Sequence, residues 1–180
     1  MKLYKTILID PPWNETGGGR IKRGADRHYH LLKDHEILQE IIKSGVFSPA
    51  DSCHMYLWVT NSFLKSGLFL MQALGFRYLT NLAWIKDRFG LGQYFRGQHE
   101  LLLFGVKGRL PAMVKNQPTA IMANRTEHSR KPDEAYAVIE AVSPPPRLEM
   151  FARRRREGWD AWGEEIKHEG GDFHESVFQG

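Results

Sequence analysis

The chain has little of what several classes of protein require. Cysteine occurs once, at Cys53, so no internal disulfide can form, which favours a reducing compartment. No apolar stretch is long enough to cross a bilayer, and Asp10 with two prolines interrupts the opening apolar run before it resembles a secretion signal. These absences argue against a disulfide framework and a membrane span, and they predict a cytoplasmic protein.

Common motifs of phosphate, acyl and metal chemistry are also missing. The sequence has no glycine-rich phosphate loop, no serine nucleophile elbow and no spacing of ligands typical of a metal site. His28 and His30 lie two residues apart without Cys or carboxylate partners, and Cys53 sits in an apolar run typical of a core position. We therefore expect neither a metal ion nor a covalent enzyme intermediate.

Strand and helix patterns alternate along the chain. Runs rich in β-branched and aromatic residues predict strands over 4–9, 54–59, 78–85, 100–106, 119–123, 147–152 and 159–163. Helices are expected from Asp34 (as N-cap) to Lys43, from Thr60 or Asn61 to Leu74, and from a first turn containing Pro132. Their core-facing residues would be Ile37, Leu38, Ile41, Ile42, Tyr136, Val138, Ile139 and Val142. The alternation predicts an α/β fold, with a mainly parallel sheet covered by helices on both faces. We expect one domain over residues 1–169 and a flexible tail over 170–180.

The first predicted strand runs directly into Asp10-Pro11-Pro12-Trp13. Ligands in open α/β sheets bind at the carboxyl ends of strands, where this turn would lie. The residues of this turn suit one difficult reaction, the attack of the exocyclic amine of adenine on a methyl donor. This amine is a poor nucleophile because its lone pair is delocalised, so activating it requires acceptors for both N–H bonds. Asp10 offers a carboxylate and Pro11 a carbonyl, while the prolines stiffen the turn. Trp13 offers a flat surface for a base removed from its stack. An ordinary turn with a packed Trp is the alternative interpretation.

Basic residues gather in three predicted loop segments. They are Arg20, Lys22, Arg23 and Arg27, then Arg125, Arg130 and Lys131, and finally the unbroken run 153–156. The long loop 14–30 and the loop 87–98, which contains Arg96, would flank the predicted site and are the candidates for the nucleic-acid surface. Such clusters suit contact with phosphates, although charge runs also occur on solvated faces.

Several blocks in order resemble the family of adenine-N6 methyltransferases that use S-adenosylmethionine, which includes the eukaryotic messenger-RNA adenosine methyltransferase and small bacterial and phage DNA enzymes. The blocks are Asp10-Pro-Pro-Trp13, 57–60, 84–86, 100–108, 130–144 and 147–163, and they span nearly the whole chain. The resemblance implies a Rossmann-like class I methyltransferase fold with circularly permuted order, in which the catalytic strand comes first. The permutation places the strand that meets the cofactor near the end, where Phe151-Ala152-Arg153 stands without the usual glycines.

The resemblance also implies roles for individual residues. Asp10 would hold the target amine and contact the methionine moiety of S-adenosylmethionine, Lys86 would meet the methionine carboxylate, and Arg153 would lie along the ribose. Tyr29 would line the entrance to the site. The chain departs from the family at Arg155 and Arg156, and at Glu164, which with its neighbour Glu165 we keep as hypothetical ribose contacts.

The function expected from these patterns is S-adenosylmethionine-dependent methylation of adenine N6 in nucleic acid. DNA is favoured over RNA because the sequence shows only a catalytic domain, and the protein would act as a monomer or homodimer. The substrate-binding residues would be Trp13, Tyr29, Arg20, Lys22, Arg23, Arg27 and Arg96. Two alternatives remain: an RNA adenosine methyltransferase, and a non-catalytic nucleic-acid-binding subunit of such an enzyme. Methylation of a free nucleobase is a weaker alternative, because it leaves the basic clusters without a purpose.

Overall fold

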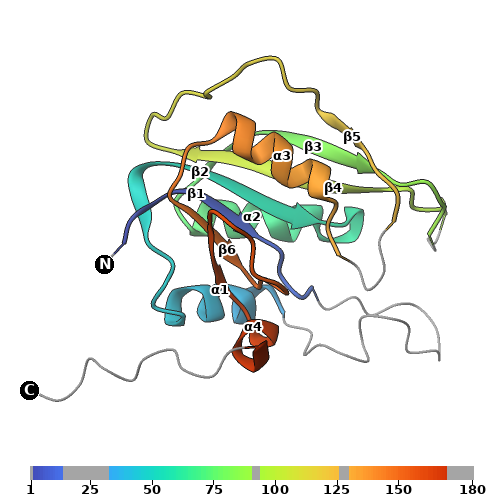
Figure 1. Ribbon diagram of the computed structural model, residues 1–180. Helices are drawn as coiled ribbons and strands as arrows, with labels where there is room; N and C mark the ends of the chain where they lie inside the picture. The colour runs from blue at the N-terminus through green and yellow to red at the C-terminus, as the bar shows by residue number, and fades with distance from the viewer. Residues whose placement is uncertain (1, 14–32, 91–93, 126–129, 170–180) are drawn as a thin grey trace, which may run out of the picture.

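The structure is a computed structural model, and it describes residues 2–13, 33–90, 94–125 and 130–169. Its centre is a sheet of seven strands in the order β5-β3-β4-β2-β1-β6-β7 (Figure 1). The strands are β1 (Tyr4–Ile9), β2 (Pro49–Val59), β3 (Arg77–Ile85), β4 (His99–Lys107), β5 (Ala120–Met122), β6 (Arg147–Met150) and β7 (Trp159–Trp162).

All strands except β4 run in the same direction. β1 pairs in parallel with β2 and β6, β6 with β7, and β3 with β5. β4 lies between β2 and β3 and is antiparallel to both, because a short hairpin connects β3 to β4. The sheet is therefore mainly parallel, as the sequence predicted, and the carboxyl ends of β1, β2, β3 and β6 lie at one edge.

Helices cover both faces of the sheet (Figure 1). On one face, α1 (Asp34–Lys43) and α2 (Leu64–Ala73) pack against alternate strand residues such as Ile7, Ile9 and Leu57. On the other face, α3 (Asp133–Val142) packs against Leu8, Tyr56 and Trp58, which point the opposite way. Both faces of the central strands are buried, so these strands read as continuous apolar runs in the sequence.

The helix ends and one buried stripe differ from the prediction. Lys33 is the N-cap of α1, so Asp34 is the first helical residue and not the predicted cap. Pro132 is the N-cap of α3 and lies just before the first turn in which it was predicted. Ile42 is 64% exposed, whereas Ile37 and Ile41 are buried. Residues four apart lie on one face of a helix, and Ile42 lies well round the axis from Ile37.

Other element bounds also shift. A 3₁₀ turn, η2 (Asn61–Phe63), precedes α2, and Gly75 at φ +83° ends the helix as expected. β2 begins at Pro49, earlier than predicted, and β6 ends at Met150, before the predicted Ala152. A short helix, α4 (Glu164–Glu169), was not predicted.

The described ranges contain neither a membrane-spanning helix nor a cluster of metal ligands. No helix there is long and apolar enough to cross a membrane. Within the same ranges, no three His, Cys, Asp or Glu side chains come together to hold a metal ion. Cys53 is buried in the core, as its apolar surroundings predicted. The predicted tail, 170–180, lies outside the described residues.

Candidate active site

Asp10 stands directly after β1, at the edge where the parallel strands end. Its backbone N–H donates to the carbonyl of Met150 at 3.2 Å, which continues the β1–β6 ladder by one residue and fixes the start of the turn. Its carboxylate lies 2.9 Å from the ammonium of Lys131, which comes from the segment just before α3. The side chains are only 12% and 9% exposed, so the pair is held largely away from water.

The ion pair extends into a chain of alternating charges. Lys131 also lies 3.5 Å from the carboxylate of Glu100 on β4, and Glu100 in turn pairs with Lys86 at the end of β3. Burial alone would raise the pKa of Glu100, but the two ammonium groups hold it below its ordinary value. Burial alone would lower the pKa of Lys131, but Asp10 and Glu100 raise it. Glu100 and Lys131 are therefore both charged near neutral pH, and each carboxylate of the chain lies against an ammonium group.

The turn after Asp10 is braced by Trp13. The Trp13 backbone N–H donates to the Pro11 carbonyl at 2.9 Å, and its indole N–H donates to the Trp58 carbonyl at 2.9 Å. The Pro11 oxygen keeps a second lone pair for another donor. The Trp13 ring is buried and stacks on Phe63, with ring centroids 5.2 Å apart and planes 16° apart. This stack leaves at most one ring face for a base.

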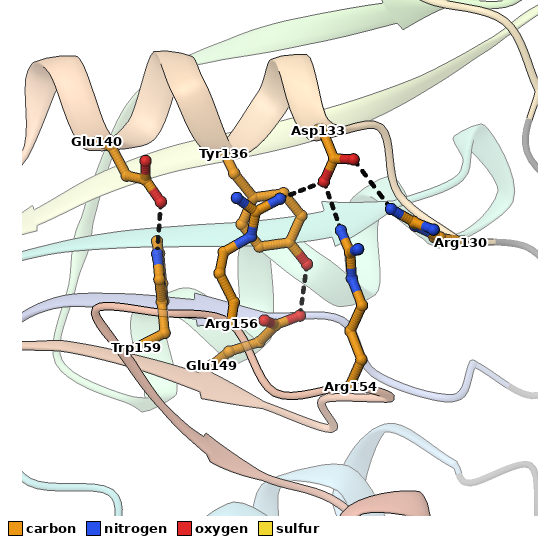
Figure 2. A network of polar contacts seen from close by, with 8 residues as sticks. All are labelled: Arg130, Asp133, Tyr136, Glu140, Glu149, Arg154, Arg156 and Trp159. Carbon is orange, nitrogen blue, oxygen red and sulfur yellow. Dashed lines mark hydrogen bonds and ion pairs between the residues drawn. The ribbon is translucent and has the colours of Figure 1, made fainter.

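A second carboxyl group, Glu149 on β6, lies on the same face of the sheet as Asp10. The Tyr136 hydroxyl of α3 donates to it at 2.7 Å (Figure 2). Burial, supported by the nearby charge of Asp10, raises the pKa of Glu149 to about 7, although the Tyr136 hydrogen bond opposes the shift. Glu149 thus changes its charge near neutral pH, on the face of the sheet that carries Asp10.

Three arginines converge on Asp133 at the start of α3 (Figure 2). Arg130 pairs with it at 2.9 Å, and Arg154 and Arg156 from the loop after β6 pair with its other oxygen. The Arg156 guanidinium also lies 4.0 Å from the centre of the Tyr136 ring. Two of the three basic clusters seen in the sequence are therefore joined through this acid, instead of forming separate solvated patches.

The loop after β6 has features that suit a bound cofactor. Phe151 adopts a φ of +59°, a left-handed conformation that favours glycine and that bulky side chains rarely adopt. A Cβ at Gly163, just after β7, would overlap the backbone of Ala152, so β7 and this loop must approach closely. Strain and tight backbone approach concentrate at ligand sites.

The residues present fit S-adenosylmethionine. Its methionine moiety carries an ammonium and a carboxylate, which match the charges of Asp10 and Lys131. One carboxylate oxygen of Glu165, after β7, is buried and has no hydrogen-bond partner among the described residues, so it can accept from a ribose hydroxyl. The fit rests on these groups rather than on a glycine-rich loop.

The residues predicted from the sequence are only partly brought together. Asp10 stands at the site, and Lys86 reaches it indirectly, through Glu100. Arg156 contacts α3, Glu164 is exposed, and Arg96 lies in the β3–β4 hairpin. Arg153 and Arg155 lie in the loop after β6, and their roles stay predictions. The others fall outside the described residues: Arg20, Lys22, Arg23, Arg27 and Tyr29.

Sequence reasoning missed Lys131, Glu100 and Glu149. Lys131 was assigned to a loop cluster for phosphates, but the structure buries it between two carboxylates. The signal available in the sequence was its place directly before Pro132 and a helix rich in apolar residues. Glu100 and Glu149 are carboxylates within apolar strands, a pattern that indicates a paired or functional acid.

The sheet order, the edge with Asp10 and the close loop after β6 define a Rossmann-like methyltransferase fold. Residues 4–165 match the MT-A70 family model, so the chain belongs to the MT-A70 family of adenine-N6 methyltransferases. This confirms the family that the sequence blocks resembled.

Individual relatives extend the comparison. The chain is 30% identical to the type II methyltransferase M.MunI of Mycoplasma sp., over 92% of this chain and 78% of that protein. It is 29% identical to the N(6)-adenosine-methyltransferase MT-A70-like protein of Arabidopsis thaliana, over 91% of this chain but 24% of that one. It is 26% identical to the N(6)-adenosine-methyltransferase catalytic subunit METTL3 of Homo sapiens, over 83% of this chain and 26% of that protein. The chain thus spans about a quarter of these eukaryotic relatives.

Proposed function

We propose that this protein transfers a methyl group from S-adenosylmethionine to N6 of adenine in nucleic acid, with DNA favoured over RNA. The observation that carries the proposal is the buried carboxylate of Asp10 at the carboxyl end of β1, held 2.9 Å from Lys131 and followed by the braced Pro11-Pro12 turn. When bound, S-adenosylmethionine supplies a methyl group activated by a sulfonium.

Asp10 acts as a fixed acceptor for the adenine amine. Its carboxylate accepts from one N–H bond, and the free lone pair of the Pro11 carbonyl accepts from the other. These two acceptors would make the amine nitrogen more tetrahedral and direct its lone pair at the methyl group that bound S-adenosylmethionine would supply. The new bond makes the nitrogen acidic, so its proton passes to Asp10 and then to solvent. Catalysis rests on positioning and on stabilising the developing positive charge.

Lys131 orients Asp10 and completes the charges of the cofactor site. Because Lys131 binds one Asp10 oxygen, the other stays available to accept from an amine. Its buried ammonium contacts Asp10 directly, whereas Lys86 is linked to Asp10 only through Glu100 and Lys131, so Lys131 is the better placed of the two to meet the methionine carboxylate.

DNA is favoured for two reasons. The match covers most of the Mycoplasma type II methyltransferase but only about a quarter of the N(6)-adenosine-methyltransferases. The small bacterial members that the sequence resembles are DNA enzymes. A single-stranded or distorted substrate would lower the cost of extruding the adenine.

Transfer of a tritiated methyl group tests the proposal. DNA and RNA oligonucleotides of matched sequence are incubated with the full chain and labelled S-adenosylmethionine, and the modified base is then identified. We expect N6-methyladenine, formed faster in DNA, and a loss of at least about 100-fold in kcat for Asp10→Asn. Asp51→Asn, an exposed acid at the start of β2, is the matched control and should keep full activity. Equal activity of Asp10→Asn and the wild type would overturn the mechanism, and faster methylation of RNA would overturn the preference for DNA.

A further inference from the structure

The hairpin between β3 and β4 exposes aromatic rings that no packing in the described structure explains. Tyr94 is 93% exposed, Phe95 89% and Phe89 65%. Single exposed apolar side chains are common on protein surfaces, but three rings in one short loop leave considerable apolar area in water. Such an arrangement is typical of a surface that contacts a partner.

Basic side chains flank these rings. Arg88 is 82% exposed and pairs with the neighbouring Asp87, and the Arg96 Nε donates to the carbonyl of Gly90 at 3.1 Å. The second contact ties the two arms of the loop together and holds Arg96 beside the rings. Aromatic rings interleaved with arginines suit a nucleic-acid strand, since the rings stack on bases and the guanidinium groups contact phosphates.

The hairpin is attached to the catalytic edge. At its base, the backbone N–H of Lys86 donates to the backbone carbonyl of Gln98 at 2.8 Å. The side-chain amide of Gln98 donates back to the backbone carbonyl of Lys86 at 3.0 Å. Lys86 is also the last member of the charge chain that leads through Glu100 and Lys131 to Asp10. Phe89 follows Lys86 by three residues, a reach of at most about 10 Å. The described arms of the hairpin therefore extend from the edge of the sheet at which β1 also ends, and Figure 1 shows them continuing past the ends of β3 and β4.

We propose that Phe89, Tyr94 and Phe95 form a stacking surface for the unpaired bases that neighbour the target adenine. The inference rests on the proposed function and adds how the substrate is held. Extruding an adenine leaves its neighbours partly unstacked, and exposed rings beside the site can take over part of that stacking. The substrate is then a single-stranded or locally opened segment, rather than an intact duplex.

Binding of a fluorescein-labelled single-stranded DNA oligonucleotide containing one adenine tests the inference on the full chain. The variant Tyr94→Ser/Phe95→Ser removes two rings, and Tyr94→Phe/Phe95→Tyr keeps both as its matched control. Phe69→Ala removes an exposed ring on α2 and controls for general loss of apolar surface. We expect the serine variant to bind at least about tenfold more weakly, and both controls to bind like the wild type. A 2-aminopurine placed next to the adenine should be quenched by the wild type and not by the serine variant.

The outcomes separate this inference from the proposed function. If the wild type methylates adenine and the serine variant binds and methylates equally well, the stacking surface is wrong and the proposed function stands. If the wild type is a dimer and the serine variant is a monomer that binds the oligonucleotide equally well, the rings form a protein interface. The inference is then likewise overturned. If the wild type methylates no oligonucleotide, the proposed function fails and the inference fails with it. Unchanged binding of S-adenosylmethionine to the serine variant, measured by calorimetry, shows that the variant is folded.

Discussion

The ammonium of Lys131 lies 2.9 Å from the carboxylate of Asp10, although the two residues come from opposite parts of the chain. The contact joins the end of β1 to the start of α3, and Lys131 contacts Glu100 as well. Because both carboxylates are shielded from water, the ammonium offsets two negative charges at this edge of the sheet. The relationship therefore links the stability of the fold to the chemistry of the site.

Replacing Lys131 with Met should lower the free energy of unfolding by about 3 kcal/mol, because it leaves two buried carboxylates without their shared cation. Adding Asp10→Asn should recover part of the loss, since it removes the carboxylate that Lys131 contacts most closely, whereas Glu100 keeps its ion pair with Lys86. Urea unfolding at neutral pH measures both effects. Lys65→Met, at an exposed position on α2, is the matched control. A Lys131→Met loss no larger than that of the control would show that the ion pair contributes nothing.

Glu149→Gln should stabilise the protein at pH 8 but not at pH 5. The pKa of Glu149 is raised to about 7, so the folded state binds its proton more tightly than the unfolded state does. The protonated Glu149 side chain therefore stabilises the folded state fully below the unfolded pKa near 4.5, and this stabilisation is lost as pH rises through about 7. Glutamine cannot ionise and its carbonyl still accepts from the Tyr136 hydroxyl. We expect a gain of about 1–3 kcal/mol at pH 8 by chemical unfolding, and equal gains at both pH values would contradict the assignment.

Much of the fold and one end of the site could be predicted from the sequence, because those features depend on local patterns. Alternating apolar runs predict the strands, and Asp10-Pro11-Pro12-Trp13 is continuous in the chain. Lys131 could not be recognised, because a lysine in a polar loop is ordinarily solvated. Only the order of the sheet, in which β2 alone separates β1 from β4, brings Asp10 and Glu100 to it. The reversed direction of β4 likewise depends on how the strands pair, which no single segment reveals.

Gly67→Ala should destabilise the protein by about 1–3 kcal/mol, although alanine favours helices. Gly67 faces β2 and β4 from α2, and a Cβ there would overlap Val59 Cγ1 and lie 3.1 Å from Leu103 Cδ1. Adding Val59→Ala removes the overlapping methyl group, so the double variant should be more stable than the sum of the two single changes predicts. Thermal unfolding of the four proteins gives this coupling. If the stability changes of the two single variants simply add in the double variant, the helix moves aside without cost.

At position 151, substitution by glycine should give a more stable protein than substitution by alanine, the reverse of the usual order. The φ of +59° at Phe151 is unfavourable for any side chain, and its ring is held edge-on against Trp162, with centroids 5.3 Å apart. Phe151→Ala loses the ring contact and keeps the strain, whereas Phe151→Gly loses the contact and relieves the strain. We expect both variants to be less stable than the wild type, by about 2 kcal/mol or more for Phe151→Ala, and Phe151→Gly to be about 1 kcal/mol more stable than Phe151→Ala. Urea unfolding compares the three proteins, and Phe104→Ala against Phe104→Gly, within β4, should show the ordinary order with alanine more stable. If glycine is the less stable residue at position 151 as well, the backbone there is not strained and the turn after β6 owes its shape to other contacts.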